Sequence, residues 1–242
     1  MTIAPSTTER TFADFRLPAF DLYRDIHKGI RAELFALTGS AGTLDPSDTV
    51  GWIALAEHTS AMERTLSDHA HHEDTFIDPV LREHLADLAE VVVSDHERLD
   101  RTFADIVEIA RGGADAGAIE RRRLAQLAYL QLSSFTSCYL AHQAIEELDI
   151  SPALERAVGP DAIVAIHMAI IGSIPPDEMA QTLTMMLPAM NVDDRTELLA
   201  GMQASAPPAA FDAVVGLAGS VLTPADFGAV ARRLELPAPA RR

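Results

Sequence analysis

One phrase of this sequence is written twice, as HAHHEDTFIDPVL at residues 69–81 and as HQAIEELDISPAL at residues 142–154. In each copy a histidine precedes a glutamate by four residues. An acid, an isoleucine, a proline and a leucine then follow at matching positions. Residues four apart lie one turn apart on the same face of a helix. The repeat therefore predicts two equivalent helices that each direct a histidine and a carboxylate into one shared metal site.

The repetition extends upstream of each phrase, because the pattern from His27 to Leu34 resembles the pattern from His96 to Phe103. Apolar residues recur at helical spacing through four long segments. These segments are residues 18–38, 47–79, 83–111 and 118–148. Short loops separate them, and Gly112 and Gly113 are expected to end the third. The fold class predicted is therefore all-α, an up-down-up-down four-helix bundle in which two helical hairpins bring the four histidines together.

Composition narrows the classes of partner. The net charge of −17 disfavours nucleic acid and anionic membrane surfaces, and no long apolar run is present to cross a bilayer. The single cysteine, Cys138, excludes an intrachain disulfide and fits a cytoplasmic location. Cys138 shares the predicted inner face of the fourth helix with Gln131 and His142, so we expect it to be a small core residue.

The spacing of histidine and acid is weak evidence taken alone. With nine histidines and 36 acids among 242 residues, chance places an acid four residues after about one histidine, and three such pairs occur. The shared frame and the apolar faces carry the argument, because a buried carboxylate is costly unless it is paired or bound to a metal. Imidazole and carboxylate together suit iron, zinc, copper or nickel, and six converging groups suggest two ions.

The order His27, His69-x-x-x-Glu73, His96, His142-x-x-x-Glu146 resembles the hemerythrin-like (HHE cation-binding) family over about residues 17–155. The resemblance implies a four-helix bundle that holds two non-haem iron ions bridged by carboxylates and an oxo or hydroxo group. It also implies that the four histidines are terminal ligands and that Glu73 and Glu146 are the bridging carboxylates.

The sequence departs from the oxygen-carrying branch of that family, whose third helix supplies two histidines four residues apart. Here the residue four after His96 is Asp100. This pattern leaves an additional coordination position open unless Asp100, His72 or Tyr23 fills it. An open position favours reaction with peroxide or O2 over reversible carriage. Tyr23 and Tyr139 each lie one turn before a ligand histidine, so they are the candidate catalytic residues, as ligands or proton donors.

The chain divides by character into an N-terminal arm (1–16), the bundle (17–155) and a C-terminal helical extension (156–242). From about Ser151, we expect four or five short helices, packed on the bundle or joining subunits of a homo-oligomer. Asn191 and Thr223 are expected to cap two of them.

The function expected is binding and reaction with O2, peroxide or NO, through peroxide breakdown or redox and oxygen sensing. The first use would make the protein a di-iron oxidoreductase of catalase, peroxidase or oxidase type. Alternatives are an O2-activating di-iron oxidase or oxygenase with an organic substrate, and a non-enzymatic sensor of O2, NO or iron.

Overall fold

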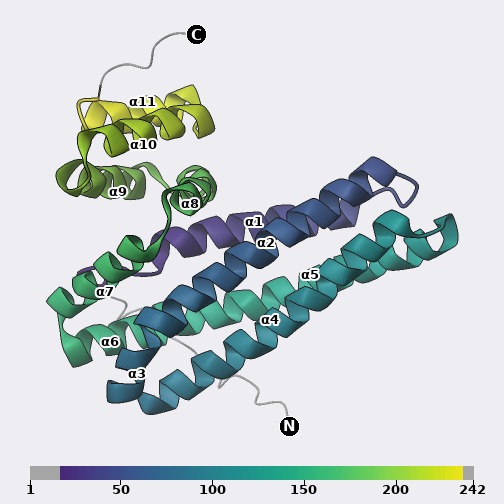
Figure 1. Cartoon of the computed structure of the whole chain (residues 1–242), viewed down its shortest axis with the longest axis horizontal. Helices are drawn as coiled ribbons and strands as arrows, with labels where there is room; N and C mark the ends of the chain where they lie inside the picture. The colour runs from purple at the N-terminus through teal and green to yellow at the C-terminus, as the bar shows by residue number, and fades with distance from the viewer. Residues whose placement is uncertain (1–16, 237–242) are drawn as a thin grey trace.

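The computed structural model describes residues 17–236 as an all-helical chain, with no strand in that range (Figure 1). Four long helices lie side by side: α1 (Arg24–Thr43), α2 (Thr49–Phe76), α4 (Ala86–Asp115) and α5 (Ala118–Ile145). Helices α1 and α4 each pack against both α2 and α5, so the four enclose a common core. The predicted all-α class is confirmed, and the predicted N-terminal arm lies outside the described residues.

The repeated frame closes one end of these four helices. After the first copy's glutamate, α2 gives way to the short helix α3 (Asp78–His84), and α5 gives way to the π-helical turn η2 (Glu146–Ile150) and α6 (Ser151–Val158). The two prolines of the frame occupy the first turns of α3 and α6, where a missing N–H costs nothing. Both copies supply one buried apolar cluster at this end: Ile77, Leu81, Ile150 and Leu154, together with Tyr23 and Val92.

A second, longer apolar cluster fills the rest of the four-helix core. It includes Leu66, which precedes His69 on α2, and Leu99, which follows His96 on α4. On the other side of these histidines, Ile77 and Val92 belong to the end cluster. His69 and His96 therefore lie at the level where the two apolar clusters meet. The polar residues of the repeat occupy a buried layer with apolar packing on both sides.

Several predicted helix ends differ from the structure, and α1 ends at Thr43 and not at about residue 38. Helix α1 begins at Arg24 and not at Pro18, because the Asp21 carboxylate accepts hydrogen bonds from the backbone N–H groups of Tyr23 and Arg24. Helix α4 continues through Gly112 and Gly113 to Asp115. Gly113 allows close packing, since a Cβ there would lie 2.1 Å from Cζ3 of Trp52.

The predicted inner face of α5 was also partly wrong. Gln131 and Cys138 are exposed, while Ala128, Leu132 and Tyr139 are buried. Large apolar residues occur on both sides of α5, so their positions in the sequence did not show which side faces the core of the four long helices. Small alanines face the neighbouring helices instead, and Cys138 is a surface residue.

The C-terminal region forms short helices that follow one another closely. They are α6, α7 (Pro160–Ser173), α8 (Pro176–Ala189), α9 (Val192–Ser205), α10 (Pro208–Val221) and α11 (Pro224–Arg233). These are six within the described residues, one more than the upper expectation. The predicted caps are confirmed: the Asn191 side chain accepts hydrogen bonds from two backbone N–H groups at the start of α9, and Thr223 accepts one at the start of α11.

Helix α8 connects this region to the four-helix core by lying against α1 (Figure 1). Gly29 permits the approach, because a Cβ there would lie 3.3 Å from the Met186 backbone. Lys28 pairs with Asp194 of α9, and Arg24 pairs with Asp194 and Glu197. The C-terminal helices therefore contact the helix that carries His27. Among the described helices, none is both long and apolar enough to cross a membrane.

Candidate metal centre

Six side chains of the repeat meet in the buried layer between the two apolar clusters. They come from all four long helices and from the first residue of η2: His27, His69, Glu73, His96, His142 and Glu146. None is more than 9% exposed. The π-helical turn that begins at Glu146 is a rare conformation found mostly as single turns at functional sites. The structure therefore brings together all six residues that the sequence singled out as metal ligands.

Each carboxylate of this group faces both halves of the repeat. Oε1 of Glu73 lies 3.2 Å from Nε2 of His69, and its Oε2 lies 3.1 Å from Nε2 of His96. Oε1 of Glu146 lies 3.0 Å from Nε2 of His142, and its Oε2 lies 3.4 Å from Nε2 of His27. Every histidine thus presents Nε2 to a carboxylate oxygen, and each carboxylate spans two histidine pairs.

Two groups of ligand atoms in this arrangement are compact enough to hold a metal ion. The first contains Glu73, His96, His142 and Glu146, and the second contains His27, His69 and Glu73. Within each group the ligand atoms lie within 4.8 Å of one another. Because Glu73 belongs to both groups, one carboxylate could bind two neighbouring ions.

A further set of carboxylates lies behind the histidines. Nδ1 of His27 is 2.9 Å from Glu147, which also accepts two hydrogen bonds from Arg31, and Nδ1 of His96 is 2.9 Å from Asp74. Such contacts fix the tautomer and the ring orientation of a ligand histidine. Glu147 and Asp74 were the two acids that the sequence placed directly after the predicted bridging residues. Their contacts direct Nε2 of both histidines towards the centre.

Asp95 is a functional candidate that sequence reasoning missed. Its Oδ2 lies 3.7 Å from Nδ1 of His142, within ion-pair distance, and the proximity of that histidine lowers the pKa of Asp95. Asp95 directly precedes His96 in the chain, so nothing in the sequence connected it with His142 on α5. The signal that could have identified it is its position beside a ligand histidine, as for Asp74 and Glu147 beside the bridging glutamates.

Burial and mutual attraction perturb the charges of the cluster strongly. Burial and repulsion from Glu146 raise the pKa of Glu73 to about 7. Burial opposes protonation of His96 and His142, but attraction to the neighbouring carboxylates outweighs it and raises their pKa values to about 11 and about 9. Burial and the neighbouring His27 lower the pKa of His69. Protons on two histidines therefore balance the buried carboxylates, and a bound cation would displace them, since metals bind neutral imidazole.

The buried polar atoms fit a cation. Within residues 17–236, both oxygens of Glu73 and of Glu146 have no hydrogen-bond partner, and neither do Nε2 of His96 and Nε2 of His142. Buried polar atoms in folded proteins nearly always have a partner, so a cluster of six without one requires an explanation. All six point towards the centre of the candidate site. Mixed imidazole and carboxylate donors match iron and other first-row transition metals.

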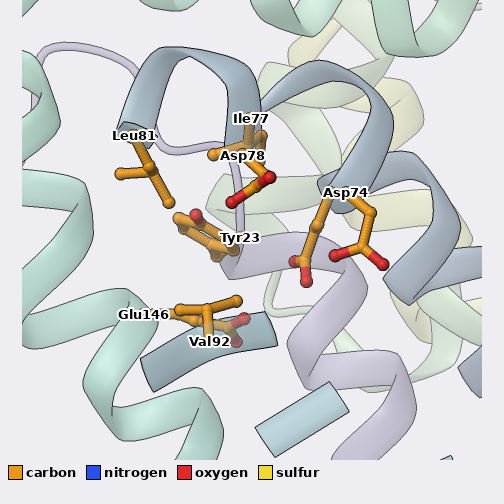
Figure 2. Close-up of a pocket in the computed structure, with 8 residues that line it drawn as sticks. Tyr23, Asp74, Ile77, Asp78, Leu81, Val92 and Glu146 are labelled. Atoms are coloured by element: carbon orange, nitrogen blue, oxygen red, sulfur yellow. The ribbon is translucent and has the colours of Figure 1, made fainter. Parts of the chain in front are cut away.

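A small cavity adjoins the carboxylates of Glu73 and Glu146 (Figure 2). Its volume is about 10 Å³, which is room for about one water molecule. The residues around it are Tyr23, Glu73, Asp74, Ile77, Asp78, Leu81, Val92 and Glu146, and the surface that they expose to the cavity is almost entirely apolar. The space in this structure is therefore close to the size of a single water molecule.

Four further residues were candidates for this site. Tyr23 is 2% exposed, lines the cavity and lies 5.2 Å from His27, ring centre to ring centre. Tyr139 is buried with its ring centre 5.7 Å from that of His142. His72 is half-buried and Asp100 is exposed, and neither belongs to the two ligand groups. Tyr23 is therefore the best placed of the four to meet a bound ligand.

The fold and this cluster define a helical protein with a buried histidine and carboxylate site for cations. Residues 19–154 match the Hemerythrin HHE cation binding domain family, which is more than half of the chain. The chain belongs to this family, as the motif had indicated. A comparison with curated proteins gives no match, and neither does a comparison with solved structures.

Proposed function

We propose that this chain is a di-iron protein that binds small oxygen or nitrogen ligands and breaks down hydrogen peroxide. The observation that carries the proposal is that Glu73 and Glu146 each present one oxygen to each half of the repeat. In this proposal both glutamates are bridging ligands, His27 and His69 bind one ion, and His96 and His142 bind the other. Two ions held in this way would supply the paired redox equivalents that peroxide chemistry requires.

Peroxide disproportionation suits a site of this kind because it needs no other reductant. One molecule of hydrogen peroxide is oxidised to O2 and a second is reduced to two molecules of water. The cavity beside the Glu73 and Glu146 carboxylates has room for about one water molecule, so a very small ligand is closer to its size than the organic substrate of the alternative oxidase. The small ligand would enter next to Glu73 and Glu146, in a space otherwise closed by the Val92 and Leu81 side chains.

Tyr23 is the proposed proton donor within this cavity. Burial and the nearby charges of Glu73 and Glu146 raise its pKa well above the usual value, so the phenol stays protonated at neutral pH. A protonated phenol beside the bridging carboxylates can donate a hydrogen bond or a proton to an oxygen ligand. In the second half of the repeat the corresponding residue is Val92, so the two halves differ chemically at this position.

A second candidate function is a non-enzymatic sensor of O2, NO or iron. The observation that favours it is the contact of α8 and α9 with α1, through Gly29, Lys28 and Arg24, close to His27. A change in the position of His27 on ligand binding could then alter the packing of the C-terminal helices. Limited proteolysis with and without ligand separates the two functions, because a sensor requires a change in the accessibility of the C-terminal helices.

The test of the proposal is iron stoichiometry together with reactivity. The full chain loaded with iron should hold about two ions, develop a visible charge-transfer band with azide and release O2 from hydrogen peroxide. Glu146→Gln and His69→Ala should lose iron, whereas His84→Ala, at a half-exposed histidine on α3, should retain it. Less than one iron per chain, with no charge-transfer band, would contradict the di-iron proposal.

A further inference from the structure

Met185 is the side chain of α8 that rests on Gly29 of α1, two residues after His27. A Cβ at Gly29 would lie 3.1 Å from Cε and 3.3 Å from Cγ of Met185. These two carbons are the ones bonded to the methionine sulfur, so the whole thioether occupies the space that the glycine leaves free. Met185 is partly exposed, and it packs against the apolar cluster of the long core. Its thioether is therefore part of the contact that joins α8 to α1.

The surroundings of Met185 suit a thioether and not a more polar group. The cluster on which it packs is apolar, and the N–H of Gly29 lies within α1, where helical hydrogen bonding uses it. Lys28, next to Gly29, already pairs with Asp194 of α9. Addition of an oxygen to the sulfur would place a hydrogen-bond acceptor in this contact. A buried polar group without a partner shifts an equilibrium by roughly 10- to 100-fold.

Helix α8 holds the C-terminal helices together with one face and contacts α1 with another (Figure 1). Leu183 and Leu187 of α8 belong to a separate apolar cluster with Ala218 of α10 and Phe227 of α11. Met185 belongs to neither that cluster nor the one around Leu199. Loss of its contact with α1 would therefore release α8 from the four long helices while the C-terminal helices keep their own core.

The position of Met185 differs from those of the other methionines. Within residues 17–236, Met185 is the only partly exposed methionine that packs against the cluster of the long core. The others are exposed on α7, packed among the C-terminal helices or buried: Met168, Met179, Met202, Met62, Met186 and Met190. An oxidant can thus reach Met185 more easily than the buried methionines, and a change there acts on the contact of α8 with α1.

We propose that Met185 is an oxidation site for hydrogen peroxide and that its sulfoxide releases α8 from α1. The sulfur attacks one oxygen of peroxide with an electron pair, an S–O bond forms and the O–O bond breaks. The other oxygen leaves with the two protons of peroxide as water, so the thioether is oxidised and peroxide is reduced. The reaction uses no metal, and the inference therefore goes beyond the proposed function without resting on it.

The test exposes the full chain to hydrogen peroxide with zinc in place of iron, because zinc has no redox chemistry. Mass spectrometry of peptides finds the methionines that gain an oxygen, and hydrogen exchange measures the protection of the α8 backbone amides. We expect oxidation of Met185 to accelerate exchange in α8 roughly 10- to 100-fold. Met185→Leu has a similar apolar volume and cannot be oxidised, so its exchange should stay slow after the same dose. Met168→Leu, the control at an exposed position, should respond as the wild type does.

Two further measurements separate oxidation of Met185 from general damage. Met185→Gln places a polar amide in the contact, so its α8 amides should exchange fast without peroxide. Methionine sulfoxide reductase should restore slow exchange in the oxidised wild type, and this result depends on no variant. Oxidation of Met185 no faster than that of the buried Met62 would overturn the inference. So would oxidised Met185 with unchanged exchange in α8, or a Met185→Leu chain that responds like the wild type. Each of these results leaves the proposed function standing, since iron takes no part in the experiment.

Discussion

The adjacent glycines of α4 should respond to alanine with opposite signs. Gly112 and Gly113 are both helical with negative φ, so alanine fits the backbone at either position. At Gly112 a Cβ would meet nothing within 4 Å. At Gly113 it would lie 2.1 Å from Cζ3 and 2.3 Å from Cε3 of Trp52. The Trp52 side chain is fully buried, and its indole N–H donates to the Pro46 carbonyl, so the ring has little freedom to move.

The magnitudes follow from these distances. Alanine in place of glycine in a helix contributes about 0.5–1 kcal/mol, so Gly112→Ala should stabilise the protein by about that amount. Overpacking a close-packed core costs about 1–3 kcal/mol, and contacts this short place Gly113→Ala at the upper end. Net of the helix gain, Gly113→Ala should destabilise by ~2 kcal/mol, which lowers Tm by roughly 4–8 °C in a chain of this size.

Thermal unfolding of the two variants side by side, followed by circular dichroism, measures this difference. Metal content should be unaffected in both, because Trp52 belongs to the apolar cluster of the long core and not to the site. If Gly113→Ala proved as stable as Gly112→Ala, Trp52 would not pack on this glycine and the close approach of α2 to α4 would be wrong. If both variants were destabilised alike, the glycine pair would be a helix end, as the sequence alone had predicted.

Four further predictions concern the site and its surroundings. Glu147→Gln should weaken iron binding by about 10- to 100-fold, because His27 loses the carboxylate that orients it; a competition titration that finds wild-type affinity would refute this role. Iron affinity should rise between pH 6 and pH 9, because the pKa of His142 is raised to about 9 and its proton must leave before a metal binds. Because the folded iron-free protein holds the His142 proton more tightly than the unfolded chain does, its stability should fall as pH rises from about 6.5 through 9. A urea-unfolding free energy that stays constant over that range would contradict this prediction. Gly29→Leu should separate α8 from α1, since its side chain would meet the Met186 backbone, and the C-terminal helices should then be cleaved faster by protease while iron content is retained.

Periodicity and the repeated phrase were sufficient to predict the helical class and the family, and they selected six residues that the structure gathers in one place. The reason is physical, since a histidine and a glutamate four residues apart can share a target only if the segment is helical and that face is buried. The caps at Asn191 and Thr223 were predictable for a similar reason, because a side chain that caps a helix acts on backbone groups two or three residues away.

The details that depend on neighbouring helices could not be predicted in this way. Gly113 looks like a helix terminator until Trp52 of another helix is placed against it, and Cys138 looks buried until the inner face of α5 is known. Asp95 contacts a histidine on α5 although it lies beside His96 in the chain. These relations join residues far apart in the sequence, and local spacing contains no information about them.

The sequence by itself predicted two halves of a candidate cation site, because the repeat determines which residue types share a helix face. Only the tertiary structure decided how those halves meet: that Glu73 and Glu146 each span both histidine pairs, and that the space beside them is about 10 Å³. It also placed Tyr23 and Asp78 together in that space, while Val92 and Ser151 hold the equivalent positions of the other copy. The two copies of the repeat therefore have different surroundings, because a cavity is formed by residues that packing brings together and not by residues that are adjacent in the chain.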